Sequence, residues 1–264
     1  MLQKLIYIYV LFFGRKCFQK MNRLMHRLSL AGLGILNYKS TRISGEKFFL
    51  KTYLAKNDCH VVVDIGANKG DYVLELLNIN PTLKIYAFEP HPTTFSCLFR
   101  NVSAHTNVNP INKGVSSNNG VLRLYDYPSK DGSQHASIYQ EVITDLHGAG
   151  SAIYHEVEST TIDTFMELEP IEYIDLLKID TEGNELEVLL GGINSIKGKR
   201  IKAIHFEFNE MNVISRVFFR DFWKILDGYR FYRLLPGGML EIKNYNPLMC
   251  EIFAYQNIVA ILKD

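Results

Sequence analysis

Four acidic residues stand at or near the carboxyl ends of predicted strands, and this pattern indicates a ligand-binding site. They are Asp64 in VVVDI (61–65), Glu89 in KIYAFE (84–89), Asp180 in IDLLKID (174–180) and Glu207 in KAIHFEF (202–208). In an open α/β sheet, ligands bind outside the carboxyl ends of the strands, near the point where the strand order reverses. Carboxylates gathered at that edge favour a ligand with hydroxyl groups and positive charge, and they would repel a polyphosphate.

Glu89 gives the most specific information about the ligand. It lies 25 residues after Asp64, at the end of the next strand. In nucleotide-binding α/β folds, an acid about 20 residues beyond the glycine turn accepts hydrogen bonds from ribose hydroxyls. A 2′-phosphate would be repelled at this place, so an NADP site is disfavoured. NAD, FAD and S-adenosylmethionine remain as alternatives.

The turn after the first strand, DIGANKG (64–70), distinguishes among these ligands. Pyrophosphate binding needs a second glycine in G-x-G, and Ala67 occupies that position. Asp71 in the first turn of the following helix offsets the positive helix end that a pyrophosphate would use. The acid and the backbone of this turn can instead bind the ammonium and carboxylate of an amino-acid-like ligand.

The surrounding elements must bring these residues together. Apolar runs that alternate with helical segments predict a largely parallel sheet with helices on both faces. The predicted strands are 61–65, 84–89, 108–112, 174–180, 202–208, 230–235 and 252–262, and the predicted helices are 71–79, 92–103, 184–191 and 216–227. The last two strands have no room for a long helix between them, so we expect a hairpin that adds an antiparallel strand.

Composition is that of an ordinary globular protein. The chain has 264 residues, of which 47% are hydrophobic and 22% charged, enough for one α/β domain with an extension. The four cysteines, Cys17, Cys59, Cys97 and Cys250, form no C-x-x-C pair. Their scatter disfavours a disulfide framework or a zinc site and fits the reducing cytoplasm.

The first 43 residues are expected to form a helical extension, with the main domain spanning 44–264. Residues 1–45 contain eight basic residues and no acidic one, whereas the remainder carries 21 basic and 28 acidic residues. The apolar run 5–13 is too short to cross a bilayer. It leads into a predicted basic amphipathic helix at 15–31, with Leu24, Leu28 and Leu30 on its apolar face. This segment could lie on the inner face of an anionic membrane or pack on the body or a second subunit.

Three ordered motifs resemble the FkbM-type family of S-adenosylmethionine-dependent methyltransferases. They read VVVDIGANKGDYVLEL, IYAFEPHPTTFSCLFRN and IDLLKIDTEGNELEVLLGG, and the similarity runs over about residues 44–262. The resemblance implies the class I methyltransferase fold, a Rossmann-like, doubly wound sheet. That sheet has seven strands and is mostly parallel, with one antiparallel strand near the C-terminus. It also implies O-methylation of sugars, polyketides and other small or glycan substrates.

The resemblance further implies which positions bind S-adenosylmethionine. The turn would surround the methionine part, Glu89 would hold the ribose, and residues on two later turns would flank the adenine. Asp180 would lie by the transferable methyl group with Glu182. The implied cofactor residues are Asp64, Gly66, Ala67, Asn68, Gly70, Glu89, Pro90, His91, Lys113, Gly114 and Asp180.

Methyl transfer to a hydroxyl benefits from a general base, and five side chains are candidates. These are Glu182, Asp180, His205, Glu207 and His135. Asp180 has a rival role as ligand of the cofactor's ammonium group, so Glu182 is the leading candidate, although it could instead cap the helix predicted at 184–191. His205 could equally be a buried core histidine. Glu207 shares its strand face by the two-residue period.

The acids at 180 and 182 are not a strong metal signature, and no bound metal is predicted. Segments 208–213 and 229–242 are candidate loops beside the acceptor, or ordinary core aromatics. The acidic body disfavours nucleic acid.

The sequence therefore predicts a cytoplasmic S-adenosylmethionine-dependent O-methyltransferase. Its acceptor would be a hydroxyl on a glycan, a lipid-linked sugar or a related small molecule. An NAD-dependent oxidoreductase and a non-catalytic module on the same fold are the alternatives.

Overall fold

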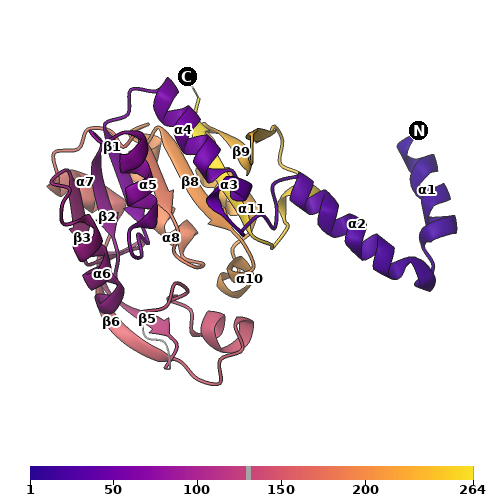
Figure 1. Cartoon of the computed structure of the whole chain (residues 1–264), viewed down its shortest axis with the longest axis horizontal. Helices are drawn as coiled ribbons and strands as arrows, with labels where there is room; N and C mark the ends of the chain where they lie inside the picture. The colour runs from indigo at the N-terminus through magenta and orange to yellow at the C-terminus, as the bar shows by residue number, and fades with distance from the viewer. Residues whose placement is uncertain (129–131, 264) are drawn as a thin grey trace.

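A mixed sheet of eight strands forms the centre of the molecule. The computed structural model describes residues 1–128 and 132–263, and the strand order is β10-β9-β11-β8-β7-β1-β2-β3 (Figure 1). Strands β3, β2, β1, β7 and β8 are mutually parallel, and β11 runs antiparallel to both of its neighbours. The strands are β1 (Val61–Ile65), β2 (Lys84–Phe88), β3 (Val108–Ile111), β7 (Leu176–Ile179), β8 (Ala203–Phe208), β9 (Tyr229–Leu235), β10 (Gly238–Ile242) and β11 (Gln256–Leu262).

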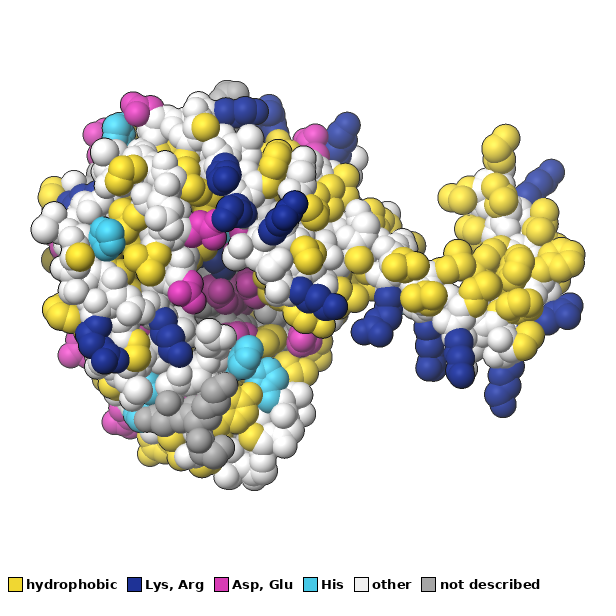
Figure 2. Space-filling model, in the orientation of Figure 1, with side chains coloured by type: hydrophobic (Ala, Val, Ile, Leu, Met, Phe, Trp, Pro, Cys, Tyr) yellow, Lys and Arg dark blue, Asp and Glu magenta, His cyan; other side chains and the backbone are white. Residues whose placement is uncertain are grey.

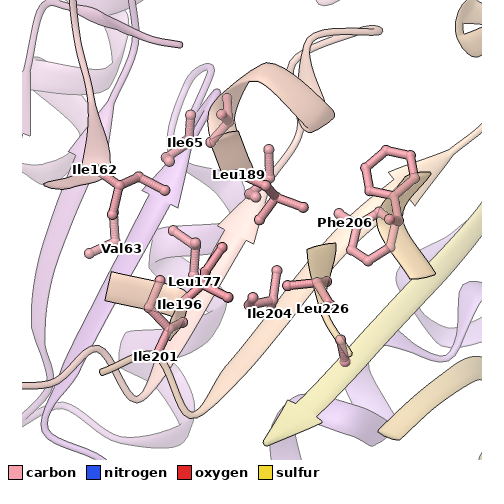
Figure 3. Close-up of a cluster of buried hydrophobic side chains, with 14 of the residues drawn as sticks. Val63, Ile65, Ile162, Leu177, Leu189, Ile196, Ile201, Ile204, Phe206 and Leu226 are labelled. Carbon is pink, nitrogen blue, oxygen red and sulfur yellow. The ribbon is translucent and has the colours of Figure 1, made fainter. Parts of the chain in front are cut away.

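Both faces of this sheet are buried, because its strands carry apolar side chains on both sides. One face packs on α7 (Ile162–Leu168), α8 (Glu185–Leu190), α9 (Ile193–Lys197) and α11 (Phe219–Ile225) through a cluster that includes Leu177 and Phe206 (Figure 3). The other face packs on α4 (Glu46–Lys56), α5 (Asp71–Ile79) and α6 (Pro92–Val102). Burying one such Leu or Phe side chain contributes about 1.5–3 kcal/mol.

The C-terminal part of the sheet differs from the sequence prediction. The sheet has an eighth strand, β10, which pairs with β9 in a hairpin across the Pro236–Gly237 turn. Strand β11 lies between β8 and β9 rather than forming a hairpin directly with β9, since β10 and the short helix α12 (Pro247–Cys250) intervene in the chain. Residues 229–242 are therefore mainly an edge hairpin and not a loop beside the acceptor.

The helix predicted at 216–227 is shorter in the structure, where it is α11, and a separate short helix that was not predicted precedes it. Helix α10 (Met211–Ser215) ends at Arg216, whose φ of 57° is left-handed, and α11 begins at Phe219. The side chain of Asp221 accepts a hydrogen bond from the backbone N–H of Phe218 (2.9 Å), which stabilises the new helix start.

A second, smaller sheet lies beside the carboxyl ends of the main strands. It contains β4 (Gly114–Val115), β6 (Ile153–Thr160) and β5 (Gly120–Asp126), in that order. The connection from β5 to β6 includes the single-turn helix Val142–Leu146. We call the described residues of this connection, 127–128 and 132–152, the β5–β6 insert.

The N-terminal extension has two parts, a projecting part before residue 30 and a part after it that lies on the body. Helix α1 (Leu2–Phe13), the short turn Lys16–Phe18 and most of α2 (Gln19–Gly32) project from the body (Figure 1), and we call residues 1–29 the projecting arm. Leu30 is buried against the body and lies away from Leu24 and Leu28, so its expected place on the exposed apolar face was wrong. Residues 30–37 pack on the main domain, with Leu30, Ile35 and Asn37 buried, and residues 38–43, which include most of α3 (Thr41–Ser44), are exposed on its surface.

Within residues 1–128 and 132–263, no helix combines the length and the hydropathy needed to span a bilayer.

Candidate functional site

A cavity of about 640 Å³ opens at the carboxyl ends of β1, β2, β7 and β8. The β5–β6 insert and the small sheet form its opposite wall, and Figure 2 shows acidic side chains gathered in the hollow at the centre of this face. Of the described residues that line it, nine are acidic and two are lysines. The acidic residues are Glu46, Asp64, Asp71, Glu75, Glu89, Asp180, Glu182, Glu207 and Glu210.

Asp64 is the most constrained of these acids. It is 2% exposed, and its Oδ2 atom has no hydrogen-bond partner in the described part of the chain. Burial, opposed in part by Lys178, raises the pKa of Asp64 to about 7. A buried carboxylate oxygen without a donor is unfavourable, so this atom fits a ligand that brings a positively charged donor.

The turn after β1 brings backbone rather than side chains to the cavity. Gly66 has a φ of 81°, and its N–H and that of Ala67 both donate to the carbonyl of Phe88 at 2.9 Å. A Cβ at position 66 would lie 1.8 Å from the carbonyl oxygen of Asp180. Gly66, Ala67 and Asn68 line the cavity as predicted, whereas Gly70 lies behind it and packs on Leu98.

Glu89 is held in place by backbone N–H groups that follow two adjacent strands, β1 and β2. Its Oε2 accepts from the N–H of Asn68 (2.9 Å) and its Oε1 from the N–H of His91 (2.8 Å). Burial, opposed by these two backbone hydrogen bonds, raises the pKa of Glu89 to about 7. Each carboxylate oxygen has a second acceptor site, so Glu89 can still accept from the hydroxyl groups of a ligand in the cavity.

The residues predicted to flank an adenine divide into two groups. Pro90, Lys113 and Gly114 line the cavity. His91 lies behind the wall, 1% exposed, and its Nε2 is 3.5 Å from Oδ2 of Asp126. His91 therefore ties α6 to the small sheet and contributes to the cavity through its backbone N–H, which donates to Glu89.

A buried lysine holds the acidic group together. Lys178 in β7 is 3% exposed, and its Nζ lies 3.2 Å from Oδ2 of Asp180. Burial alone would lower its pKa, but Asp180, Glu207, Glu46 and Asp64 outweigh this effect and raise the pKa of Lys178. Lys178 is therefore positively charged at neutral pH.

Glu182 and His135 form a pair at the cavity wall. Nδ1 of His135 lies 3.1 Å from Oε1 of Glu182, and burial raises the pKa of Glu182 to about 7. Glu182 does not cap α8, whose N-cap Asn184 has no side-chain cap hydrogen bond. The turn before the helix is held by Glu185, whose Oε1 accepts from the N–H groups of Thr181 and Gly183 at 3.0 and 3.1 Å. The side chain of Glu182 is thus directed to His135 of the β5–β6 insert.

The remaining two candidate bases lie at different depths. Glu207 lines the cavity, and burial together with Asp180 raises its pKa well above the usual value. His205 does not line the cavity, because Tyr72 stands in front of it. Its ring nitrogens lie 3.2 Å from the Tyr72 hydroxyl and 2.9 Å from Oδ1 of Asn257. Burial lowers the pKa of His205 well below its usual value, so the structure places it among the core residues.

Sequence reasoning missed several wall residues. Lys178 could have been found, since a lysine within the apolar run LLKI is unusual for a buried parallel strand. Glu46, Tyr72 and Tyr255 carried no comparable signal. Segment 208–213 does reach the cavity through Asn209 and Met211.

Within the described ranges, no group of three or more His, Cys, Asp or Glu side chains is arranged to hold a metal ion.

Replacing Gly66 by alanine tests the close backbone approach. The new Cβ would meet the Asp180 carbonyl and force a strained φ, so we expect Gly66→Ala to lower the free energy of unfolding by at least about 2 kcal/mol. Gly148→Ala is the matched control, because Gly148 also has a positive φ (69°) but open space around a Cβ. Urea denaturation of both variants measures the difference, and equal losses would show that the contact is unimportant.

The raised pKa of Asp64 predicts a pH dependence of stability. The native carboxyl binds its proton more tightly than the unfolded one, so its stabilising contribution is complete below pH 4 and is lost as the pH rises through about 7. Between pH 5 and 8, the ligand-free protein should lose about 2–3 kcal/mol relative to Asp64→Asn. Denaturation of both proteins at each pH measures this, with Asp58→Asn as a control because the Asp58 side chain is 94% exposed. Parallel curves for the native protein and Asp64→Asn would contradict the assignment.

Comparison with known proteins agrees with this geometry. The family model described as the methyltransferase FkbM domain matches residues 64–231. The methyltransferase sdnD of Sordaria araneosa is 35% identical over 153 residues, which are 49% of this chain and 59% of that protein.

Two further relatives have names that state the group or the position that they methylate. The hexuronic acid methyltransferase AglP of Haloferax volcanii is 26% identical over 59% of each chain. The 2-O-methyltransferase NoeI of Sinorhizobium fredii is 25% identical over 68% of this chain and 76% of that protein. The match spans about three fifths of the length of sdnD and AglP.

The family match covers the turn after β1, the strand end with Glu89 and the Asp180–Glu182 segment, all of which meet at one cavity. The chain belongs to the FkbM family of S-adenosylmethionine-dependent methyltransferases.

Proposed function

We propose that this protein transfers a methyl group from S-adenosylmethionine to a hydroxyl oxygen of a glycan or a related small molecule. The observation that carries the proposal is the pair of buried carboxylates, Asp64 and Glu89, on adjacent strand ends of one cavity. Asp64 lacks a donor, and Glu89 keeps acceptor sites free for a diol. The two groups fit the ammonium end and the ribose of the same cofactor.

Other residues fit the rest of the cofactor. The turn at 66–68 lines the cavity where the methionine part would lie, with its N–H groups already donating to Phe88 and Glu89, and Asp180 is a second acceptor for the ammonium. Pro90, Lys113 and Gly114 are the groups available to the adenine. When bound, S-adenosylmethionine supplies an electrophilic methyl group attached to a sulfonium.

The protein's task in the chemical step is to position the acceptor hydroxyl and take its proton. We assign the role of general base, which takes the proton of the acceptor hydroxyl, to the Glu182 carboxylate, because its pKa of about 7 suits a base at neutral pH. His135 orients that carboxylate from the β5–β6 insert. Glu207, at the opposite side of the acidic group, remains a candidate contact for the acceptor.

The charge of the cavity limits the acceptor. Nine acids against two lysines repel anionic groups even when some of the acids are protonated. We therefore favour a neutral sugar hydroxyl over a uronic acid or a sugar phosphate inside the cavity. The same charge disfavours the pyrophosphate of NAD, which is the main argument against an oxidoreductase.

The proposed catalytic unit includes residues 30–43 as well as 44–264, since Leu36, Tyr38 and Thr41 line the cavity. We place the protein in the cytoplasm, with support from its cysteines, all of which are free thiols. Because the projecting arm is basic and apolar, it favours an acceptor that is bound to a lipid.

Calorimetric titration tests the cofactor. We expect S-adenosylhomocysteine to bind with micromolar affinity and NAD not to bind. Glu89→Ala should weaken binding by about 10–100-fold, because a charge-assisted hydrogen bond contributes about 1.5–3 kcal/mol. Glu156→Ala is the control, since this side chain is 62% exposed and outside the cavity. Preferential binding of NAD would refute the proposal, and binding of neither would favour a non-catalytic module.

Kinetics test the base. Glu182→Gln should lower kcat by about 10²–10⁴-fold and leave the KM for S-adenosylmethionine unchanged. In the native enzyme, kcat should rise with pH through about 7, because the deprotonated carboxylate is the active form. The assay measures transfer of labelled methyl to a panel of neutral oligosaccharides, with Glu156→Gln as control. An unchanged kcat or pH profile in Glu182→Gln would show that another group is the general base.

A further inference from the structure

The projecting arm exposes an unusual amount of apolar surface. None of the residues of α1 is buried, and Leu5, Ile8 and Phe12 are 60%, 53% and 60% exposed. Apart from Gln3 and Lys4, the helix is hydrophobic around its whole circumference. A helix of this kind is stable in water only where something covers it on several sides.

Helix α2 carries its apolar and basic side chains on two neighbouring faces. At 100° per residue, Leu24, Met25 and Leu28 share one face, and they are 58%, 50% and 63% exposed. Lys20, Arg23 and Arg27 share the face beside it. Figure 2 shows basic side chains in a row along one edge of the arm, with hydrophobic side chains on the remaining surface.

We propose that the projecting arm is an interfacial anchor for an anionic lipid bilayer. The apolar surface of α1 and α2 would lie among the acyl chains, and the basic face of α2 would lie among the headgroup phosphates. Residues 1–45 carry no acid that would oppose this contact. A lipid interface can surround α1 on several sides, whereas a second copy of the chain would cover one side and leave the rest exposed.

The arm is joined to the cavity wall by short and well-packed chain. Leu30 is buried, Ile35 bridges to Gln256, and the N–H of Leu36 donates to the carbonyl of Tyr255 at 2.7 Å. The ring of Tyr38 lies edge-on to that of Tyr255, with centroids 5.9 Å apart. Leu36, Tyr38 and Tyr255 all line the cavity.

An anchored arm would therefore hold the cavity close to the lipid surface. This deepens the proposed function, on which it rests, by specifying that the acceptor hydroxyl belongs to a lipid-linked glycan. The uncharged sugar would enter the acidic cavity, and any phosphate of the carrier would stay among the headgroups near the basic face.

Vesicle sedimentation of the full-length protein tests the anchor. We would compare phosphatidylcholine vesicles with vesicles that contain a third of phosphatidylglycerol. Two double variants address the two faces, Leu24→Gln with Leu28→Gln, and Arg23→Gln with Arg27→Gln. Their matched controls lie on the body, Leu168→Gln with Leu248→Gln (79% and 83% exposed), and Arg123→Gln with Lys197→Gln.

We expect the native protein to bind the anionic vesicles and the controls to bind equally well. The leucine variant should bind at least about tenfold more weakly. The arginine variant should bind about 25-fold more weakly, since each cation near an anionic surface contributes about fivefold. S-adenosylhomocysteine titration of the same samples should be unchanged, which separates failure of the anchor from failure of the proposed function.

Three results would overturn the anchor. They are no sedimentation of the native protein, equal sedimentation of the arm variants, or a stable dimer that the leucine variant dissociates. The acceptor has its own readout, in which labelled methyl from S-adenosylmethionine should enter the organic-solvent fraction of a membrane extract. Label in the aqueous fraction alone would refute a lipid-linked acceptor.

Discussion

The positive charge of Lys178 is the constraint on which the rest of the site depends. It lies in the middle strand of the sheet, almost without solvent exposure, and four carboxylates from α4, β1, β7 and β8 share its field. Burying these carboxylates without a nearby cation would be very unfavourable, and so would burying the lysine without the carboxylates. The lysine thus permits acids from distant parts of the chain to converge at one end of the sheet. It also sets how much negative charge is left for a cationic ligand.

Local sequence signals predicted the main elements well where one pattern dominated. The strand at 61–65 and the helix at 71–79 were placed to the residue, because a β-branched run meets a glycine turn and then an amphipathic helix. Strand β10 was missed, since its sequence is short and half-exposed and its existence depends on pairing with β9. Helix α10 was also missed, because its five residues are too few to show a helical period.

The candidate site was harder to predict than the fold, because it depends on contacts between distant segments. The two-residue period correctly put His205 on the same strand face as Glu207, but it could not show that Tyr72 of α5 stands before the histidine. The sequence left Glu182 as either the base or a cap of the helix predicted at 184–191. Only the structure shows that Glu185 binds the backbone of the turn and leaves Glu182 for His135. Glu46 reaches the acidic group from outside the family match.

The β5–β6 insert and the strand ends form two separate parts of the cavity wall. Its contribution to the wall, Ser133, Gln134, His135, Ala136, Ile138 and His147, comes from one continuous stretch of chain. The strand ends on the other side are fixed by the buried core of the sheet. This stretch is anchored at its root by Asp126, which accepts from the backbone of Gly132 and Ser133. If, as proposed, the strand ends bind the methyl donor, replacing this one segment would change the acceptor preference without disturbing the donor site.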